Sequence, residues 1–244
     1  MNFNVVIFIR SYNRGFMLSQ NEPLRLGSLF FVALVVSLSV HEFFHALVAL
    51  FCGDSTAKER GRLTLNPLAH LDPFGTVMLA ILAFQGMGIG WAKPVSVDTY
   101  ALRKNRMIGL VALAGPLSNL LMALLAFQVL ILVQAFLFSN FSVPFVIEAL
   151  IVDFLNVFIR VNIALSAFNL LPIYPLDGAK VLSSLLPAEW SRMVDSFFIK
   201  HGARPLLLFV LWEWFLPIPG PISFILGPFM QFFIRILEYS SFYL

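Results

Sequence analysis

The chain has 244 residues, of which 59% are hydrophobic and only 12% carry charge. Soluble globular domains carry about twice that share of charged residues, so the composition excludes an ordinary soluble domain and favours a protein embedded in lipid. The net charge of +3 comes from basic residues clustered between apolar runs, a distribution that sets orientation in membranes, so we expect no nucleic-acid partner.

The first elements follow from apolar runs and their breaks. Residues 1–25 contain too short an apolar stretch to cross a bilayer, so we expect them to lie along the membrane surface. A first core helix is predicted from about Leu26 to Phe51, where Gly53 and a charged residue end it. Residues 62–66 then alternate between polar and apolar side chains, which predicts a short strand.

The next apolar segment, residues 73–91, is interrupted by four glycines. It fits either a thin membrane crossing or a helix that enters the bilayer and returns, and we prefer the re-entrant interpretation. Its glycine-rich end, residues 86–90, is expected to act as a hinge. Residues 91–97 alternate again and predict a second short strand.

The second half of the chain is predicted to be helical. A second core helix is expected over residues 107–138 and a third over about 144–171. An amphipathic stretch over 187–204 is expected to rest at the membrane interface. The apolar C-terminal region, cut by four prolines, predicts two more membrane helices at about 204–240.

These elements predict an all-α polytopic membrane protein with a three-helix core over about residues 27–186, additional membrane helices and short membrane-associated β segments. We expect residues 1–244 to form a single membrane-embedded domain. Seven basic residues lie between Lys58 and Arg106, which predicts that the loop after the first core helix is cytoplasmic. That orientation depends on the re-entrant interpretation of residues 73–91.

The strongest chemical signal lies within the first core helix, where residues 41–45 have the pattern H-E-x-x-H. Because residues four apart share a helix face, His41 and His45 can bind one metal ion. Zinc fits such nitrogen donors, and Glu42 would then act as general base on a zinc-bound water. The alternatives are packed core histidines or a proton relay, but three unpaired ionisable residues in lipid would each cost about 2.5 kcal/mol or more.

A third metal ligand is predicted where the third core helix breaks. Residues 169–178 contain two prolines and then Asp177, and irregular backbone at membrane depth is tolerated only beside protein or a wet cavity. Asp177 is therefore the expected third ligand. The alternative is a loop aspartate that caps the next helix.

Three motifs in this order resemble the site-2 protease family: His41 to His45, residues 115–119 (G-P-L-S-N) and residues 169–178. The resemblance covers about residues 34–186 and implies a catalytic core in which His41, His45 and Asp177 bind one zinc ion and Glu42 is the catalytic base. It implies hydrolysis of peptide bonds in the transmembrane segments of membrane-anchored proteins, as in regulated intramembrane proteolysis. The chain has no room for a PDZ domain between its core helices.

The resemblance also suggests that Asn169 holds the substrate carbonyl or the oxyanion, although a bond between helices is nearly as good an interpretation. For Asn119 we favour a packing role. His70 and His201 lie away from the motifs, so neither is named as a ligand. An unwound substrate is expected to pair with the predicted strands at 62–66 and 91–97.

The expected location is the cell (inner) membrane, with lipid and membrane-spanning substrates as partners and the active site nearer the cytoplasmic side. Two rival functions remain. An inert relative that binds membrane partners would usually have lost the base or a ligand. This chain keeps the base and all three expected ligands. A metal or proton transporter would need paired repeats or a path of ionisable residues, which we do not find. The sequence does not determine the natural substrate or the oligomeric state.

Overall fold

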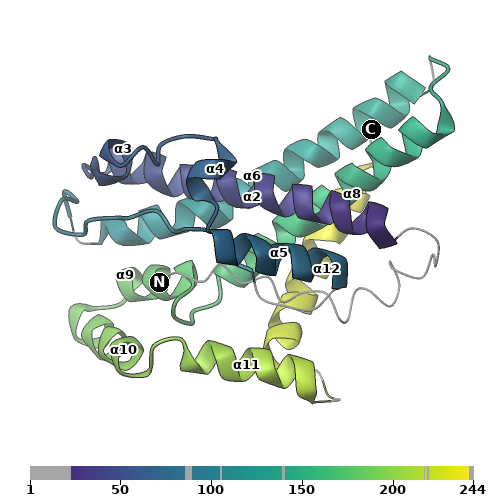
Figure 1. Ribbon diagram of the computed structural model, residues 1–244. Helices are drawn as coiled ribbons and strands as arrows, with labels where there is room; N and C mark the ends of the chain where they lie inside the picture. The colour runs from purple at the N-terminus through teal and green to yellow at the C-terminus, as the bar shows by residue number, and fades with distance from the viewer. Residues whose placement is uncertain are drawn as a thin grey trace.

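The computed structural model describes residues 23–85, 90–104, 106–138, 141–216, 218 and 220–241. These residues form a helical assembly in which segments far apart in sequence lie side by side (Figure 1). The helices in chain order are α2 (Pro23–Phe51), α3 (Thr56–Glu59), α4 (Pro67–His70), α5 (Pro73–Gln85), α6 (Met107–Leu132), the π-helical η1 (Val133–Leu137), α8 (Phe145–Asn169), α9 (Asp177–Leu185), α10 (Ala188–His201), α11 (Arg204–Phe215) and α12 (Pro221–Ser241).

Two of the described helices are long and apolar enough to cross a membrane: Leu24–Phe51 in α2, and Met107–Leu137 in α6 with η1. The third predicted core helix, α8, has 25 residues but carries three charged side chains along its first two thirds. The 13 residues of α5 make a helix about 20 Å long, shorter than a hydrocarbon core of about 30 Å. The number of membrane crossings therefore stays a prediction.

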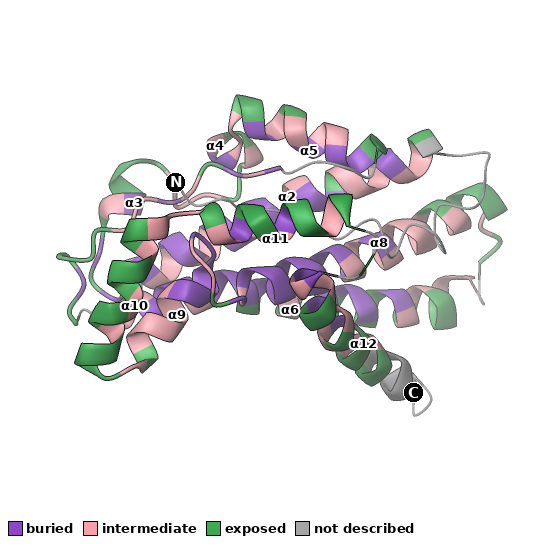
Figure 2. Cartoon of the chain, turned by 90° about the horizontal axis from the view of Figure 1, so that it is seen from below, coloured by how far each residue is buried: buried purple, intermediate pink, exposed green. Residues whose placement is uncertain are grey.

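The three predicted core helices pack against one another and form the centre of the molecule. Helix α2 lies against α6 and α8, and α6 lies against α8. Buried residues gather along these three helices, whereas α10 and one face of α11 are largely exposed (Figure 2).

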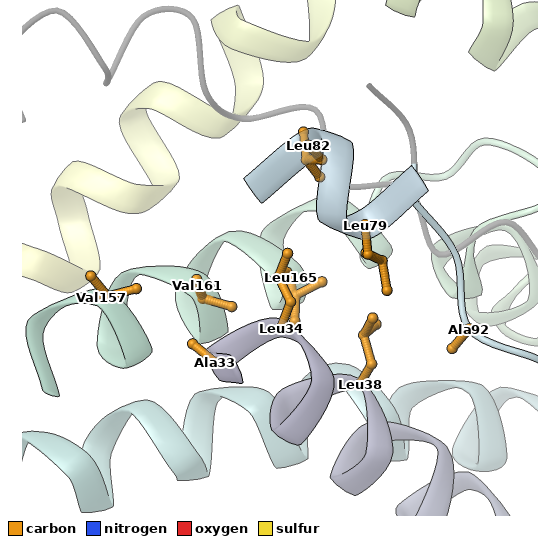
Figure 3. Close-up of a cluster of buried hydrophobic side chains, with 9 residues drawn as sticks. All are labelled: Ala33, Leu34, Leu38, Leu79, Leu82, Ala92, Val157, Val161 and Leu165. Atoms are coloured by element: carbon orange, nitrogen blue, oxygen red, sulfur yellow. The ribbon is translucent and has the colours of Figure 1, made fainter. Parts of the chain in front are cut away.

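One apolar cluster fixes α5 against this core (Figure 3). Leu79 of α5 and Leu34 of α2 are fully buried, and Leu165 of α8 is 1% exposed. Ala92, from the extended segment after α5, is buried in the same cluster. The remaining members are Ala33, Leu38, Leu82, Val157 and Val161. This cluster holds the extended segment close to the C-terminal half of α2, where the H-E-x-x-H motif lies.

The C-terminal helices close the other side of α8. A second buried cluster joins Leu206 and Val210 of α11 and Ile222 and Leu226 of α12 to Phe168 near the end of α8. The predicted helices at 204–240 are thus present as α11 and α12, and the amphipathic stretch is present as α10.

The two predicted strands are wrong, because the described part of the chain contains only an isolated antiparallel bridge, Leu71 with Ala92. Residues 62–66 form an irregular, bent segment instead: the Asn66 N–H donates to the Thr64 hydroxyl at 3.1 Å, and the Asn66 side chain caps α4. These local side-chain bonds compete with strand pairing.

The second predicted strand, residues 91–97, has no neighbouring strand to pair with among the described residues. The Lys93 N–H donates to the His70 carbonyl at 2.7 Å, and the Val95 N–H donates to a side chain, that of Glu42, at 2.8 Å. Two further predictions, a surface segment at residues 1–25 and a glycine hinge at 86–90, fall almost entirely outside the described residues.

Candidate metal centre

Three ionisable side chains of the H-E-x-x-H motif are buried in the C-terminal half of α2. His41, Glu42 and His45 are 0%, 2% and 7% exposed. Because residues four apart share a helix face, the two histidines lie together, with ring centroids 4.6 Å apart. Glu42 occupies the neighbouring side of the helix. Such burial of ionisable groups requires partners that neutralise or bond them.

The carboxylate of Asp177, the first residue of α9, meets the two imidazoles. Its Oδ2 atom lies 3.1 Å from His41 Nε2 and 3.2 Å from His45 Nε2, and the two Nε2 atoms are 3.0 Å apart. Ligand atoms about 2.1 Å from a tetrahedral zinc ion are about 3.4 Å from one another, so the observed spacing is close to that of a zinc site. Three residues predicted as ligands are therefore brought together by the fold.

The hydrogen bonds of the two outer ring nitrogens leave the inner nitrogens free to bind a cation. His45 Nδ1 lies 2.7 Å from the Val111 carbonyl, which can only accept, so this nitrogen carries the proton. His41 Nδ1 lies 2.6 Å from the Asn119 side-chain oxygen. Neutral rings bonded in this way point both Nε2 lone pairs at each other and at Asp177. Lone pairs at this distance repel unless a cation lies between them, and two nitrogens with one carboxylate oxygen suit zinc.

Gly115 of α6 leaves room for the ligand atoms. A Cβ at this position would lie 2.4 Å from His45 Nε2 and 2.5 Å from His41 Nε2. Helix α6 therefore passes so close to the ligand atoms that only glycine fits. The next residue, Pro116, has no N–H and interrupts the hydrogen-bond ladder of α6 within two turns of Val111, the carbonyl partner of His45.

The loop after α8 delivers Asp177 to this position. A Cβ on Gly178 would lie 2.3 Å from the carbonyl oxygens of Leu170 and Leu171, so the first turn of α9 packs directly against the end of α8. The alternative prediction, an aspartate that only caps a helix, is not what the structure shows. The N-cap of α9 is Leu176, and the Asp177 carboxylate lies against the Nε2 atoms of both histidines.

A small cavity of about 20 Å³ adjoins the ligands, enough space for about one water molecule. Glu42 lines this cavity beside His45 and Asp177, together with Val95, Val97, Ile108, Val111, Ala112 and Lys180. The Val95 N–H donates to Glu42 Oε2 at 2.8 Å and fixes the carboxylate at the cavity wall. The site thus provides three ligand atoms, a space for water and a carboxylate beside that space.

Asn169 is fully buried at the end of α8, but its amide group is bonded within its own helix. Its Nδ2 donates to the Leu165 carbonyl at 2.9 Å, and its Oδ1 has no partner among the described residues. One of the two N–H groups of the Asn169 amide, which an oxyanion contact would use, is therefore already bonded to Leu165. His70, which was not predicted as a ligand, bonds the Thr64 carbonyl through Nε2 at 2.7 Å.

Asn119 has a different role from the one predicted, because it bonds the His41 ring and does not only pack between helices. One sign of this was visible in the sequence: Asn119 lies four residues after Gly115 and thus on the same face of α6. Val95 was missed as well, since a backbone N–H has no sequence signature.

Comparison with known proteins agrees with this geometry. Residues 29–211, most of the chain, match the family described as Peptidase family M50. The chain belongs to peptidase family M50. This membership confirms the resemblance to site-2 proteases and the predicted enzyme class, a zinc metalloprotease, and it agrees with the membrane association that the two apolar helices indicate.

Individual M50 relatives are found in several bacteria. The chain is 41% identical to the “Putative zinc metalloprotease YwhC” of Bacillus subtilis over 201 residues, which cover 78% of this chain and 87% of the relative. It is 32% identical to the “Putative zinc metalloprotease Rip2” of Mycolicibacterium smegmatis over 204 residues, 79% of this chain and 74% of the relative. The Rip2 protein of Mycobacterium tuberculosis is 34% identical over 176 residues, 70% of this chain and 63% of the relative. No solved structure matches the chain significantly.

Proposed function

We propose that this M50 peptidase is an intramembrane zinc metalloprotease that hydrolyses peptide bonds in the transmembrane segments of membrane-anchored proteins. The observation that carries the proposal is the convergence of His41, His45 and Asp177 inside an apolar helix assembly, beside a cavity that Glu42 lines. A metal site with an adjoining water space is what a hydrolase requires, and its position within α2, a helix long and apolar enough to cross a membrane, supports chemistry at membrane depth.

In this proposal His41, His45 and Asp177 hold one zinc ion. When bound, zinc lowers the pKa of a coordinated water to about 7 and polarises the scissile carbonyl. Glu42 takes a proton from the attacking water at its carboxylate and passes it to the leaving amine as the C–N bond breaks. The Val95 N–H holds that carboxylate in place at the wall of the cavity.

Asn169 is proposed as a residue that contacts the substrate backbone. Its Oδ1 is buried with no partner among the described residues, and its amide has a second N–H beyond the one given to Leu165. Replacing Asn169 by alanine should lower kcat/KM about 10-fold and leave the zinc content unchanged, since the residue is not a ligand. Native kcat/KM in this variant would reduce Asn169 to a helix-packing residue.

The extended segment of residues 91–97 is proposed to guide the substrate to the site. A membrane helix must unwind before its carbonyls can be attacked, and extended backbone offers partners for the unwound chain. Val95 and Val97 line the cavity beside Glu42, so a substrate that lies along this segment would pass the reacting groups.

The membrane arrangement is also part of the proposal. We place α2, α6 and α8 across the cell membrane with α11 and α12 as further membrane helices, and α5 as a re-entrant segment. The active site then lies nearer the cytoplasmic side, because the basic residues between Lys58 and Arg106 follow α2. We propose residues 1–244 as one membrane-embedded domain.

The direct test uses the purified full chain in lipid vesicles with a model substrate that has a single transmembrane helix. We expect cleavage that a zinc chelator abolishes and added zinc restores, with mass spectrometry placing the cut inside the apolar segment. Cleavage confined to the soluble tails would contradict the intramembrane site. Zinc flux into the same sealed vesicles without cleavage would favour a transporter, and zinc binding with neither activity would favour an inert relative.

A further inference from the structure

A chain of buried polar side chains runs outward from the metal centre through the middle of the core. Asn119 of α6, Asn162 of α8 and Ser37 of α2 are all fully buried. None of the three ionises, and none is among the residues that line the catalytic cavity. Polar groups at such depth in lipid are costly unless they bond one another, so their bonding partners indicate what they do.

The hydrogen bonds connect the three core helices in one sequence. Asn162 Nδ2 donates to the Ser37 hydroxyl at 2.8 Å and to the Phe158 carbonyl at 2.9 Å. Asn119 Nδ2 donates to Asn162 Oδ1 at 2.9 Å and approaches the Ser37 carbonyl at 3.5 Å. The Asn119 Oδ1 atom then accepts from His41 Nδ1 at 2.6 Å.

The direction of these bonds is fixed at their far end, not at the metal. The Phe158 carbonyl can only accept, so the Asn162 amide nitrogen must face it and the Asn162 oxygen must face Asn119. That oxygen attracts the Asn119 nitrogen, which leaves the Asn119 oxygen for His41. An oxygen at this position requires a proton on His41 Nδ1 and keeps the Nε2 lone pair free.

We propose that Asn162 is a positioning residue for the metal centre: it sets the orientation of the Asn119 amide and thereby holds His41 in the tautomer that binds metal through Nε2. This inference rests on the proposed zinc site. Asn162 bonds Asn119, and Asn119 in turn bonds His41, so Asn162 acts through Asn119. Groups that orient a ligating histidine raise metal affinity, and their loss typically lowers it about 10- to 100-fold.

A purely structural role for Asn162, as a bond between α8 and its neighbours, predicts different behaviour. It would make the helix assembly less stable when removed, yet the effect would not depend on whether residue 119 can present an oxygen to His41. Asn156 supplies a matched control, because it lies on the same helix and its amide bonds the Val152 carbonyl of that helix.

The experiment measures zinc affinity of the full chain in lipid nanodiscs by competition with a chelator, which needs no substrate. We expect Asn162→Leu to weaken zinc binding about 10-fold and Asn156→Leu to leave it unchanged. Circular dichroism confirms that each variant keeps its helices. Native zinc affinity in a folded Asn162→Leu variant would overturn the inference.

A double variant separates orientation from packing. In Asn119→Asp both side-chain atoms that can face His41 are oxygens, so no amide needs to be oriented. Adding Asn162→Leu to Asn119→Asp should therefore cost no zinc affinity, whereas an equal loss in both backgrounds would overturn the inference. If Asn162→Leu does not fold, Asn119→Ala and Asn119→Asp test the same step: the first should lose affinity about 10- to 100-fold and the second should retain it, and equal affinities in the two would overturn the inference.

The same assay distinguishes failure of this inference from failure of the proposed function. If the native chain binds zinc and His45→Ala abolishes binding, the metal site stands whatever the Asn162 variants do. If His45→Ala binds zinc as the native chain does, the metal site itself is wrong, and Asn162 has no metal ligand to position.

Discussion

The carboxylate of Glu42 and the backbone N–H of Val95 are joined by a 2.8 Å hydrogen bond across 53 residues of sequence. Glu42 is 2% exposed, and both residues line the cavity beside the metal ligands. The bond makes the extended segment after α5 part of the proposed active site, because it holds the proposed base against the wall of the water space.

Replacing Val95 by proline removes this N–H while keeping an apolar, extended residue. Because a buried hydrogen bond to a charged group is worth about 1.5–3 kcal/mol, we expect kcat to fall about 10-fold or more, with zinc content unchanged. Val95→Ala keeps the N–H and is the matched control, with near-native kcat. Cleavage rates and bound zinc check both variants; native kcat in Val95→Pro would show that the bond does not position Glu42.

Gly115 should tolerate no side chain. Its Cβ would lie about as close to the two ligand nitrogens as the ion itself, so Gly115→Ala should lose most of its bound zinc. Gly227 provides the control, since a Cβ there has no neighbour within 4 Å, and Gly227→Ala should bind zinc normally. Mass spectrometry of the purified variants measures the bound zinc and compares Gly115→Ala with Gly227→Ala. Full zinc occupancy in Gly115→Ala would mean that α6 can move away.

The stability of the fold should depend on pH through Asp54, in the loop after α2. Burial raises the pKa of its carboxyl, but hydrogen bonds from Thr56 and from the backbone N–H of Asp98, with the charge of Arg60, outweigh burial and lower the pKa overall. A carboxyl with a lowered pKa stabilises the fold at neutral pH, and this contribution is lost as the pH falls through the folded-state pKa.

We therefore expect Asp54→Asn to be less stable than the native chain by about 1–2 kcal/mol at pH 7, with the difference shrinking toward about pH 3. Thermal unfolding at the two pH values measures this change. Glu189→Gln, on an exposed turn of α10, should show no such difference. If the stability difference between Asp54→Asn and the native chain stayed constant down to the lower pH, the charge of Asp54 would be ruled out as its cause.

The long helices could be predicted because lipid imposes a length and composition that the sequence displays directly. The second core helix begins at Met107 as expected, and the first ends at Phe51. The two histidines could be paired because a spacing of four residues determines that they share a face. Asp177 could be named because a carboxylate that follows two prolines at the end of a predicted membrane helix needs a polar partner, and a metal ion supplies one.

Contacts between helices could not be predicted, since they depend on how one helix is rotated against another. Asn119 was expected to pack, yet the register of α6 against α2 puts its amide on His41. Asp153 pairs with Arg25, 128 residues away, and nothing near it in sequence indicates this partner. The first predicted strand, residues 62–66, was wrong because alternation was judged without the local bonds of Thr64 and Asn66.

The central claim is that His41, His45 and Asp177 hold the zinc and Glu42 performs the proton transfer. The measurement that tests it compares the native chain with Glu42→Gln and Asp177→Ala for bound zinc and for cleavage of a transmembrane model substrate. We expect that the native chain cuts, that Glu42→Gln keeps zinc but does not cut, and that Asp177→Ala loses zinc. Cleavage by Glu42→Gln, or full zinc in Asp177→Ala, would contradict the claim.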